Sequence, residues 1–187
     1  MNYPNIIIGG HINAGKTTIA NYLINTYKYN KYSLGDGVKH FVSDLYSILH
    51  KIDPNIQEIE LDEMYNRDTK EQHREKMQLI ATELIRKYFG DDIWLKYIED
   101  KIKFPFVIDD LRFENEYSHF KKMLNTIYIR VIRDEEILSD HISENQLDDT
   151  NKIKPDYVIK NINGDLNKLY DDINMIIDSN TYSKNDV

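Results

Sequence analysis

The segment Gly10-His11-Ile12-Asn13-Ala14-Gly15-Lys16-Thr17 constrains the fold more than any other part of the chain, because it matches the pattern G-x-x-x-x-G-K-[ST]. It follows the β-branched run Asn5–Ile8, and helical spacing of apolar residues continues behind it from Lys16 to about Tyr27. A short buried run, a glycine-rich turn and a helix together predict the first strand–loop–helix unit of a parallel sheet.

Each part of this loop suits the binding of nucleotide phosphates, although a glycine-rich turn with a solvated lysine is the alternative. Glycines let successive backbone N–H groups point at one anion, and the following helix adds the positive end of its dipole. Lys16 supplies a mobile charge for β- and γ-phosphate oxygens, and the Thr17 hydroxyl suits Mg²⁺ ligation. The loop therefore predicts an ATP site with Mg²⁺ as cofactor. The predicted phosphate-binding residues are Gly10, Asn13, Ala14, Gly15, Lys16, Thr17 and Thr18.

Strand-like and helix-like segments alternate along all 187 residues. Further strands are expected at 32–34, 104–108, 126–132 and 157–159, and a closing helix is expected from about residue 166. This alternation predicts a doubly wound α/β sheet. The long segments 36–103 and 134–154 are interpreted as inserts on one core domain of residues 1–187, and 179–187 as a loose tail.

Composition excludes several classes of function. Lys and Arg number 24 against 32 Asp and Glu, so the net charge of −8 disfavours sequence-independent nucleic-acid binding. The absence of cysteine excludes disulfides, a thiolate nucleophile and cysteine-based zinc sites. Neither a signal-peptide pattern nor a bilayer-spanning apolar run is present, so we expect a cytoplasmic protein without membrane contact.

Acidic and basic residues follow the predicted strand 104–108. Asp109 and Asp110 stand where the strand ends, and the carboxyl ends of parallel strands face the ligand crevice. We expect one of them to orient Mg²⁺ through its water shell, although either could instead cap the helix that begins near Phe113. Arg112 is expected to point towards the same crevice, with a surface ion pair to a nearby glutamate as its alternative.

Polar residues also recur every four positions along the predicted helix 71–88. At about 100° per residue they form one slowly winding stripe, which suits a phosphate plus a base or sugar edge, or else an ordinary solvated face. The stripe consists of Arg74, Gln78, Thr82 and Arg86. The apolar face beside it is predicted to contain Met77, Ala81, Leu84 and Tyr88.

Arg130 and Arg133 precede the charged segment 134–154, which is interpreted as a lid over the site or as a surface loop. Trp94 is more typical of a core residue than of a stacking platform. The histidines show no metal-like spacing, so no zinc site is predicted. The chain also lacks the N-K-x-D motif of GTPases, which favours a small-molecule kinase.

Several motifs, in order, resemble those of the deoxynucleoside monophosphate (dNMP) kinases of bacteriophages and some large DNA viruses. Beside the phosphate loop, the chain carries counterparts of the family elements F-A-D-P-L-K, R-x-x-L-Q-x-x-G-T-E-x-x-R, G-x-D-I-W, V-I-S-D-V-R-F-P-N-E, R…H-x-S-E and D-Y-V-I-x-N-x-G. These counterparts are residues 34–39, 74–86, 90–94, 107–116, Arg133 with His141-Ile142-Ser143-Glu144, and 156–159 with Asn163-Gly164. Thr17, Gly37, Ala81 and Glu114 depart from the family pattern.

The resemblance implies a P-loop kinase fold with a five-stranded parallel sheet sandwiched by helices, an acceptor-binding insert at 36–103 and a lid at 134–154. It also implies ATP-dependent phosphorylation of a dNMP in a host cytoplasm. By matched position, the implied acceptor-binding residues are Asp36, Lys39, Arg74, Gln78, Thr82, Glu83, Arg86 and Arg112. Lys16, Arg112 and Arg133 are the implied catalytic residues, and Thr17, Asp109 and Asp110 the metal-side residues.

Two other functions stay open at this point. The chain could phosphorylate another small phosphorylated acceptor, such as phosphomevalonate, or it could bind nucleotide without catalysis. The expected partners are in each case small molecules rather than nucleic acid or a membrane, and homodimer formation stays open.

Overall fold

The computed structural model describes residues 2–66, 68–133, 153–162 and 165–181. The chain forms two compact units, one from residues 1–32 and 101–187 and the other from residues 33–100. Most of the predicted lid therefore lies outside the described residues, together with His141, Ser143, Glu144, Asn163, Gly164 and the end of the tail. None of the helices in the described part of the chain is long and apolar enough to cross a membrane.

The first unit contains a five-stranded sheet in which all neighbouring strands are parallel. Its strand order is β2-β3-β1-β4-β5, which places the strand before the phosphate loop at the centre. This confirms the predicted α/β fold with a five-stranded parallel sheet. The strands are β1 (Asn5–Gly9), β2 (Asn30–Tyr32), β3 (Phe106–Ile108), β4 (Thr126–Arg133) and β5 (Tyr157–Asn161).

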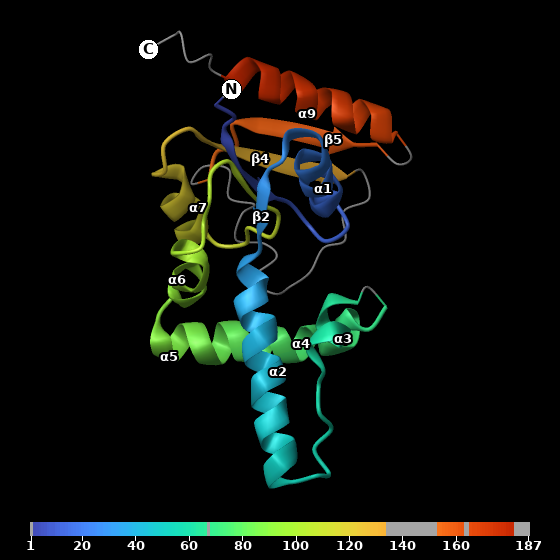
Figure 1. Ribbon diagram of the computed structural model, residues 1–187, viewed down its shortest axis with the longest axis vertical. Helices are drawn as coiled ribbons and strands as arrows, with labels where there is room; N and C mark the ends of the chain where they lie inside the picture. The colour runs from blue at the N-terminus through green and yellow to red at the C-terminus, as the bar shows by residue number, and fades with distance from the viewer. Residues whose placement is uncertain (1, 67, 134–152, 163–164, 182–187) are drawn as a thin grey trace. The chain divides into compact units, whose positions relative to one another are not determined.

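Helices cover both faces of this sheet. Helices α1 (Lys16–Tyr27) and α9 (Leu166–Asn180) contact each other and share one apolar cluster with the strands (Figure 1). On the other face lies α7 (Glu114–Lys121), whose Phe120 ring stands 5.9 Å from that of Phe106. Side chains of successive strand residues alternate between faces, so the runs of isoleucine and valine fill both layers. The shared cluster includes Ile6, Ile8, Ile19, Leu23, Val107, Ile129, Val131, Ile159, Leu169 and Ile173.

The second strand lies earlier than predicted. Residues 32–34 were expected to be extended, but β2 ends at Tyr32, and Leu34 is the first residue of α2 (Leu34–Ile52). The pairing of the strands explains the difference, because Lys31 and Tyr32 lie opposite Val107 and Ile108 of β3. The apolar side chain of Leu34 is buried within the first turn of the helix instead.

The second unit is helical. After α2 come α3 (Leu61–Tyr65), the 3₁₀ turn η1 (Lys70–His73), α4 (Arg74–Gln78), the π-helix η2 (Leu79–Arg86), α5 (Lys87–Phe89) and α6 (Ile93–Glu99). Figure 1 shows α2 crossing the segment that contains α4, and the two are in contact. Trp94 belongs to the apolar cluster of this unit, and its indole N–H donates to the Ala81 carbonyl at 3.3 Å. The prediction of a core role for Trp94 is confirmed.

The predicted apolar face of helix 71–88 is partly wrong. Leu84 and Tyr88 are 45% and 70% exposed, whereas Ile80, Ala81 and Ile85 are buried. Residues 79–86 form a π-helix, in which hydrogen bonds run from residue i to i+5. Because this bonding lengthens the turn, buried positions recur at wider spacing than the three- and four-residue pattern of an α-helix.

Truncation of a buried residue between sheet and helix should test this packing. We expect Phe120→Ala to lower the free energy of unfolding of the first unit by about 3–5 kcal/mol, because the fully buried ring leaves a cavity. The matched control is Leu124→Ala, since Leu124 is 92% exposed and should change stability by less than about 0.5 kcal/mol. Urea denaturation followed by circular dichroism measures both values, and equal losses would contradict the described packing.

Candidate functional site

The loop between β1 and α1 adopts backbone conformations that favour glycine. Gly10 and Gly15 have φ values of 145° and 109°, and Asn13 has a φ of 61°. A Cβ atom on Gly10 would lie 2.2 Å from the Val131 carbonyl oxygen, so this position also leaves no room for a side chain. Both glycines of the sequence motif are therefore required by the backbone path of the loop.

Side chains at the ends of the neighbouring strands β4 and β5 donate hydrogen bonds to the loop. The side-chain amide of Asn161, the last residue of β5, donates to the Ala14 carbonyl at 2.8 Å. Arg133, the last residue of β4, donates from Nη1 to the Asn13 carbonyl at 3.2 Å. The guanidinium predicted to be catalytic therefore touches the phosphate loop. Asn161 was missed as a site residue, because the asparagine of the motif D-Y-V-I-x-N-x-G was matched to Asn163. The spacing of the motif, with one residue between Ile159 and the asparagine, indicates Asn161.

Lys16 is folded onto the loop. Its Nζ donates to the carbonyls of Gly10 at 2.6 Å and His11 at 2.7 Å. The next residue, Thr17, is exposed, and Thr18 is half-buried, both in the first turn of α1. No acidic residue occupies that turn, so the positive end of the helix dipole is not offset locally. These features suit an incoming polyphosphate, for which the Lys16 ammonium could exchange its carbonyl partners.

The two aspartates after β3 have different surroundings. Asp109 is 6% exposed, and its carboxylate forms an ion pair with Lys31 of β2 at 2.8 Å. Asp110 is half-buried. Lys31 was missed in the sequence, because its proximity to Asp109 depends on the parallel register of β2 with β3. The Asp109 carboxylate is therefore buried and held by Lys31, so a structural role between β2 and β3 is open to it.

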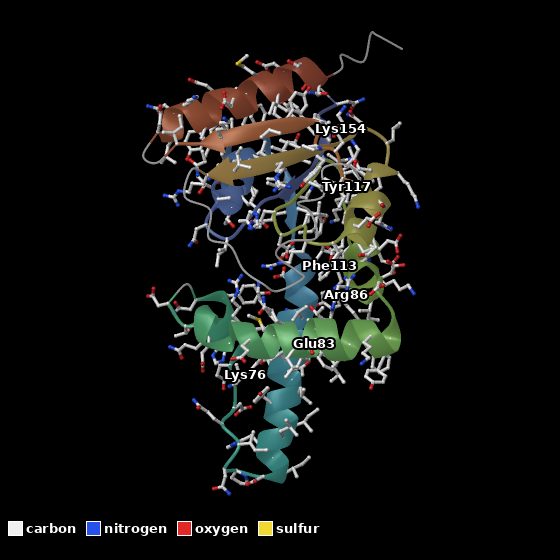
Figure 2. The ribbon with its side chains drawn as sticks, turned by 180° about the vertical axis from the view of Figure 1, so that it is seen from behind. Lys76, Glu83, Arg86, Phe113, Tyr117 and Lys154 are labelled. Atoms are coloured by element: carbon white, nitrogen blue, oxygen red, sulfur yellow. The ribbon has the colours of Figure 1, made fainter. Side chains whose placement is uncertain are left out.

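An aspartate N-cap for the helix after this strand is ruled out. The N-cap position of α7 is Phe113, and the carboxylate of Glu116 accepts hydrogen bonds from the backbone N–H groups of Arg112 and Phe113 at 2.8 and 3.0 Å. Figure 2 labels Phe113 and, one turn further along α7, Tyr117. Glu116 therefore orders the backbone at Arg112, whose side chain is half-buried.

The donor set fits a metal that arrives with the nucleotide. Within the described ranges, no group of three or more His, Cys, Asp or Glu side chains could hold a metal ion. Mg²⁺ in phosphoryl-transfer sites typically uses one or two protein oxygens together with phosphate oxygens and waters. The Thr17 hydroxyl and the Asp110 carboxylate are oxygen donors of this kind. Thr17 lies in the first turn of α1, and Asp110 follows β3, the neighbour of β1 in the sheet.

The second unit holds the predicted acceptor residues. Asp36 and Lys39 form an ion pair at 3.0 Å in the first turns of α2. On α4 and η2, the side chains of Arg74, Gln78 and Thr82 are half-buried, and Glu83 is exposed. Figure 2 labels Glu83 and Arg86 on this segment.

Arg86 differs from the rest of the predicted stripe. Its side chain is 5% exposed, and its Nη2 lies 3.5 Å from the Asp91 carboxylate, which is 74% exposed. The π-helical turn therefore carries this guanidinium towards the interior of the unit. Contact of the four stripe residues and Glu83 with an acceptor stays a prediction.

The chain was compared with protein families, curated proteins and solved structures. No family model matches the chain, and no curated protein shows significant sequence similarity to it. Among solved structures, it is similar to a dephospho-CoA kinase from Campylobacter jejuni at TM-score 0.45 and 15% identity, covering 95% of this chain and 98% of that one. It is also similar to TT1252 from Thermus thermophilus at TM-score 0.42 and 18% identity, covering 97% and 100%. These structures do not test the resemblance to dNMP kinases, which stays a prediction.

Removal of the amide that holds the loop should weaken nucleotide binding. We expect Asn161→Ala to raise the Kd for MgATP about five-fold, the equivalent of one hydrogen bond of about 1 kcal/mol. The matched control is Asn180→Ala, which removes an amide bonded to Tyr157 and Ile176 instead of the loop. Isothermal titration calorimetry measures both, and an unchanged Kd for Asn161→Ala would contradict the role given to this contact.

Proposed function

We propose that the chain is an ATP-dependent kinase that transfers the γ-phosphoryl group of ATP to a deoxynucleoside monophosphate, giving ADP and the diphosphate. The observation that carries the proposal is the glycine-dependent loop of β1 and α1 beside the acidic end of β3. Ile7 of β1 lies opposite Ile108 of β3, so Gly10 and Asp110 leave adjacent strands at the same edge of the sheet. The motif order along the chain supports the choice of acceptor.

The proposed reaction needs no protein nucleophile. An acceptor phosphate oxygen, already ionised at neutral pH, attacks the γ-phosphorus while the bond to the β,γ-bridging oxygen breaks. Catalysis then depends on positioning and on neutralising charge. Mg²⁺, when bound, offsets charge on the β- and γ-phosphates.

The residues of the first unit are given distinct roles. Lys16 exchanges the Gly10 and His11 carbonyls for phosphate oxygens, since an ammonium is a mobile hydrogen-bond donor. Arg133, which touches the loop at Asn13, and Arg112 offset charge on the transferring group. The Thr17 hydroxyl would hold the metal. Of the two aspartates, we assign the orientation of the metal's water shell to Asp110, because Asp110 is half-buried and open to water, whereas Asp109 is 6% exposed.

The acceptor is assigned to residues of the second unit, and Arg112 keeps the acceptor-side role that the motif resemblance implies. Arg74 with Gln78 and Thr82 offers donors for the acceptor phosphate and base edge. Asp36 and Lys39 form a separate polar pair on α2. The buried Arg86 is assigned a supporting role, in which it orders the helix that carries Thr82 and Glu83.

The experiment that tests the proposed reaction is product identification. ATP labelled with ³²P at the γ position is incubated with Mg²⁺ and each of the common dNMPs, with the ribonucleotides as controls. Label in a deoxynucleoside diphosphate would support the proposal. Label in no diphosphate, together with measurable ATP binding, would contradict it.

Substitution of the loop lysine should abolish turnover. We expect Lys16→Met to raise the barrier by about 3 kcal/mol or more, which is a loss of at least about 150-fold in kcat, because the charge on the transferring phosphoryl group is no longer offset. A coupled assay of ADP release measures this. Wild-type turnover by the variant would remove Lys16 from the mechanism.

Substitution of Asp110 and substitution of Asp109 should have different effects on the Mg²⁺ dependence of activity. We expect Asp110→Asn to raise the Mg²⁺ concentration needed for half-maximal activity about ten-fold or more, since a charged ligand to the metal's water shell is lost. Asp109→Asn should mainly lower stability, because it leaves Lys31 without its carboxylate partner. Mg²⁺ titrations and thermal denaturation of both variants check this. The reverse pattern would assign the metal to Asp109.

A further inference from the structure

Three side chains of the second unit form a compact polar cluster. Two of them are predicted acceptor residues, and the third, Tyr65, belongs neither to the sequence motifs nor to the stripe of helix 71–88. Asp36 and Lys39 lie in the first turns of α2, and Tyr65 is the last residue of α3. We call Asp36, Lys39 and Tyr65 the Asp36 cluster. Tyr65 lies 29 positions from Asp36 in the chain, so its participation depends on the packing of α3 against α2.

Each member of the Asp36 cluster contacts the other two. The Oδ1 atom of Asp36 accepts hydrogen bonds from Lys39 Nζ at 3.0 Å and from the Tyr65 hydroxyl at 2.9 Å. The same Nζ lies 4.0 Å from the centroid of the Tyr65 ring, within the range of a cation–π interaction. Three mutual contacts hold the carboxylate in one orientation, which is the preorganisation that a binding site requires.

The exposed part of the cluster is its acidic and aromatic side. The Tyr65 residue is 46% exposed and the Asp36 side chain 36%, whereas the Lys39 side chain is 20% exposed. Both donors are directed at Oδ1, and among the described residues Oδ2 has no hydrogen-bond partner. An ionised carboxylate oxygen only accepts hydrogen bonds. The cluster therefore presents a fixed acceptor atom beside an aromatic ring.

This chemistry selects one part of a nucleotide. A phosphate is repelled by the carboxylate, and a hydrogen-bond acceptor on a base gains nothing from it. A hydroxyl group on a ring with apolar C–H faces satisfies both features, because the hydroxyl donates to Oδ2 and the ring packs against the tyrosine. Amino and ring N–H groups of the bases could also donate to Oδ2, but they differ in position from base to base. The donor that every deoxynucleoside monophosphate shares is the 3′-hydroxyl of the deoxyribose.

We propose that Asp36 Oδ2 accepts a hydrogen bond from the 3′-hydroxyl of the acceptor nucleotide, and that Tyr65 is the residue that positions this carboxylate. The inference rests on the proposed function and deepens it by assigning the sugar contact. Tyr65 acts through Asp36 in this role, with its hydroxyl holding Oδ1. The alternative is a purely structural link between α2 and α3, in which the same contacts serve stability alone.

A pair of ligands that differ only in the 3′-hydroxyl separates the two roles. Isothermal titration calorimetry is performed with a dNMP and its 2′,3′-dideoxy counterpart, for each of the bases, on the wild type and on Asp36→Asn, Tyr65→Phe and Tyr88→Phe. Tyr65→Phe keeps the ring and removes only the hydroxyl. Tyr88 is the matched control, because it is 70% exposed and lies beneath a lysine, Lys87, at 5.8 Å.

We expect the wild type to bind the dNMP at least about ten-fold more tightly than the dideoxy ligand, as for a hydrogen bond to a charged group. Asp36→Asn should abolish most of this difference, and Tyr65→Phe should reduce it while leaving dideoxy binding unchanged. Tyr88→Phe should match the wild type. Because Tyr65→Phe removes a single exposed hydroxyl, it tests the inference even if Asp36→Asn fails to fold.

Three outcomes would overturn the inference. Equal affinities of the wild type for both ligands would show that the 3′-hydroxyl makes no contact. Equal losses for both ligands in Tyr65→Phe, with a lower Tm, would assign the cluster to stability alone. If no dNMP binds the wild type while MgATP does, the proposed acceptor fails first, and this inference fails with it.

Discussion

The backbone path of residues 10–15 is the constraint on which the first unit depends. Positive φ angles at Gly10, Asn13 and Gly15 turn the chain from the central strand β1 into α1. Asn161 and Arg133, at the ends of β5 and β4, donate hydrogen bonds to backbone carbonyls of the loop and keep it in this shape. A central strand with parallel neighbours on both sides is what places these side chains, and Asp110 after β3, at one edge of the sheet.

Much of this fold could be predicted because its signals are local. Runs such as Ile6–Ile8 and Ile127–Ile129 are buried on both faces, and β-branched runs of this kind indicate parallel strands. Two predictions failed, one where pairing with a distant strand decides and one where the hydrogen bonding of a helix decides. The strand β2 ends at Tyr32 because its register with β3 defines it, and the apolar spacing of helix 71–88 is altered by the π-helix at Leu79–Arg86.

In the candidate site, too, local features could be predicted and long-range contacts could not. The loop residues are contiguous in the sequence, so a motif identifies them. The contacts between residues far apart in the chain leave no such motif. The pairs Lys31–Asp109 and Tyr65–Asp36 join residues separated by 78 and 29 positions, and each exists only once strands or helices have packed. Arg86 shows the opposite error, since its spacing placed it on a polar stripe and the structure buries it beside Asp91.

The most direct test of this account is to follow the backbone amides of the ¹⁵N-labelled protein by NMR during titration with MgATP. If the N–H groups of the loop point at the phosphates, the largest shift changes should occur at residues 11–18, with smaller changes at Asn161 and Arg133. Saturable binding that leaves these amides unchanged and shifts a different part of the chain would contradict the assignment of the phosphate site.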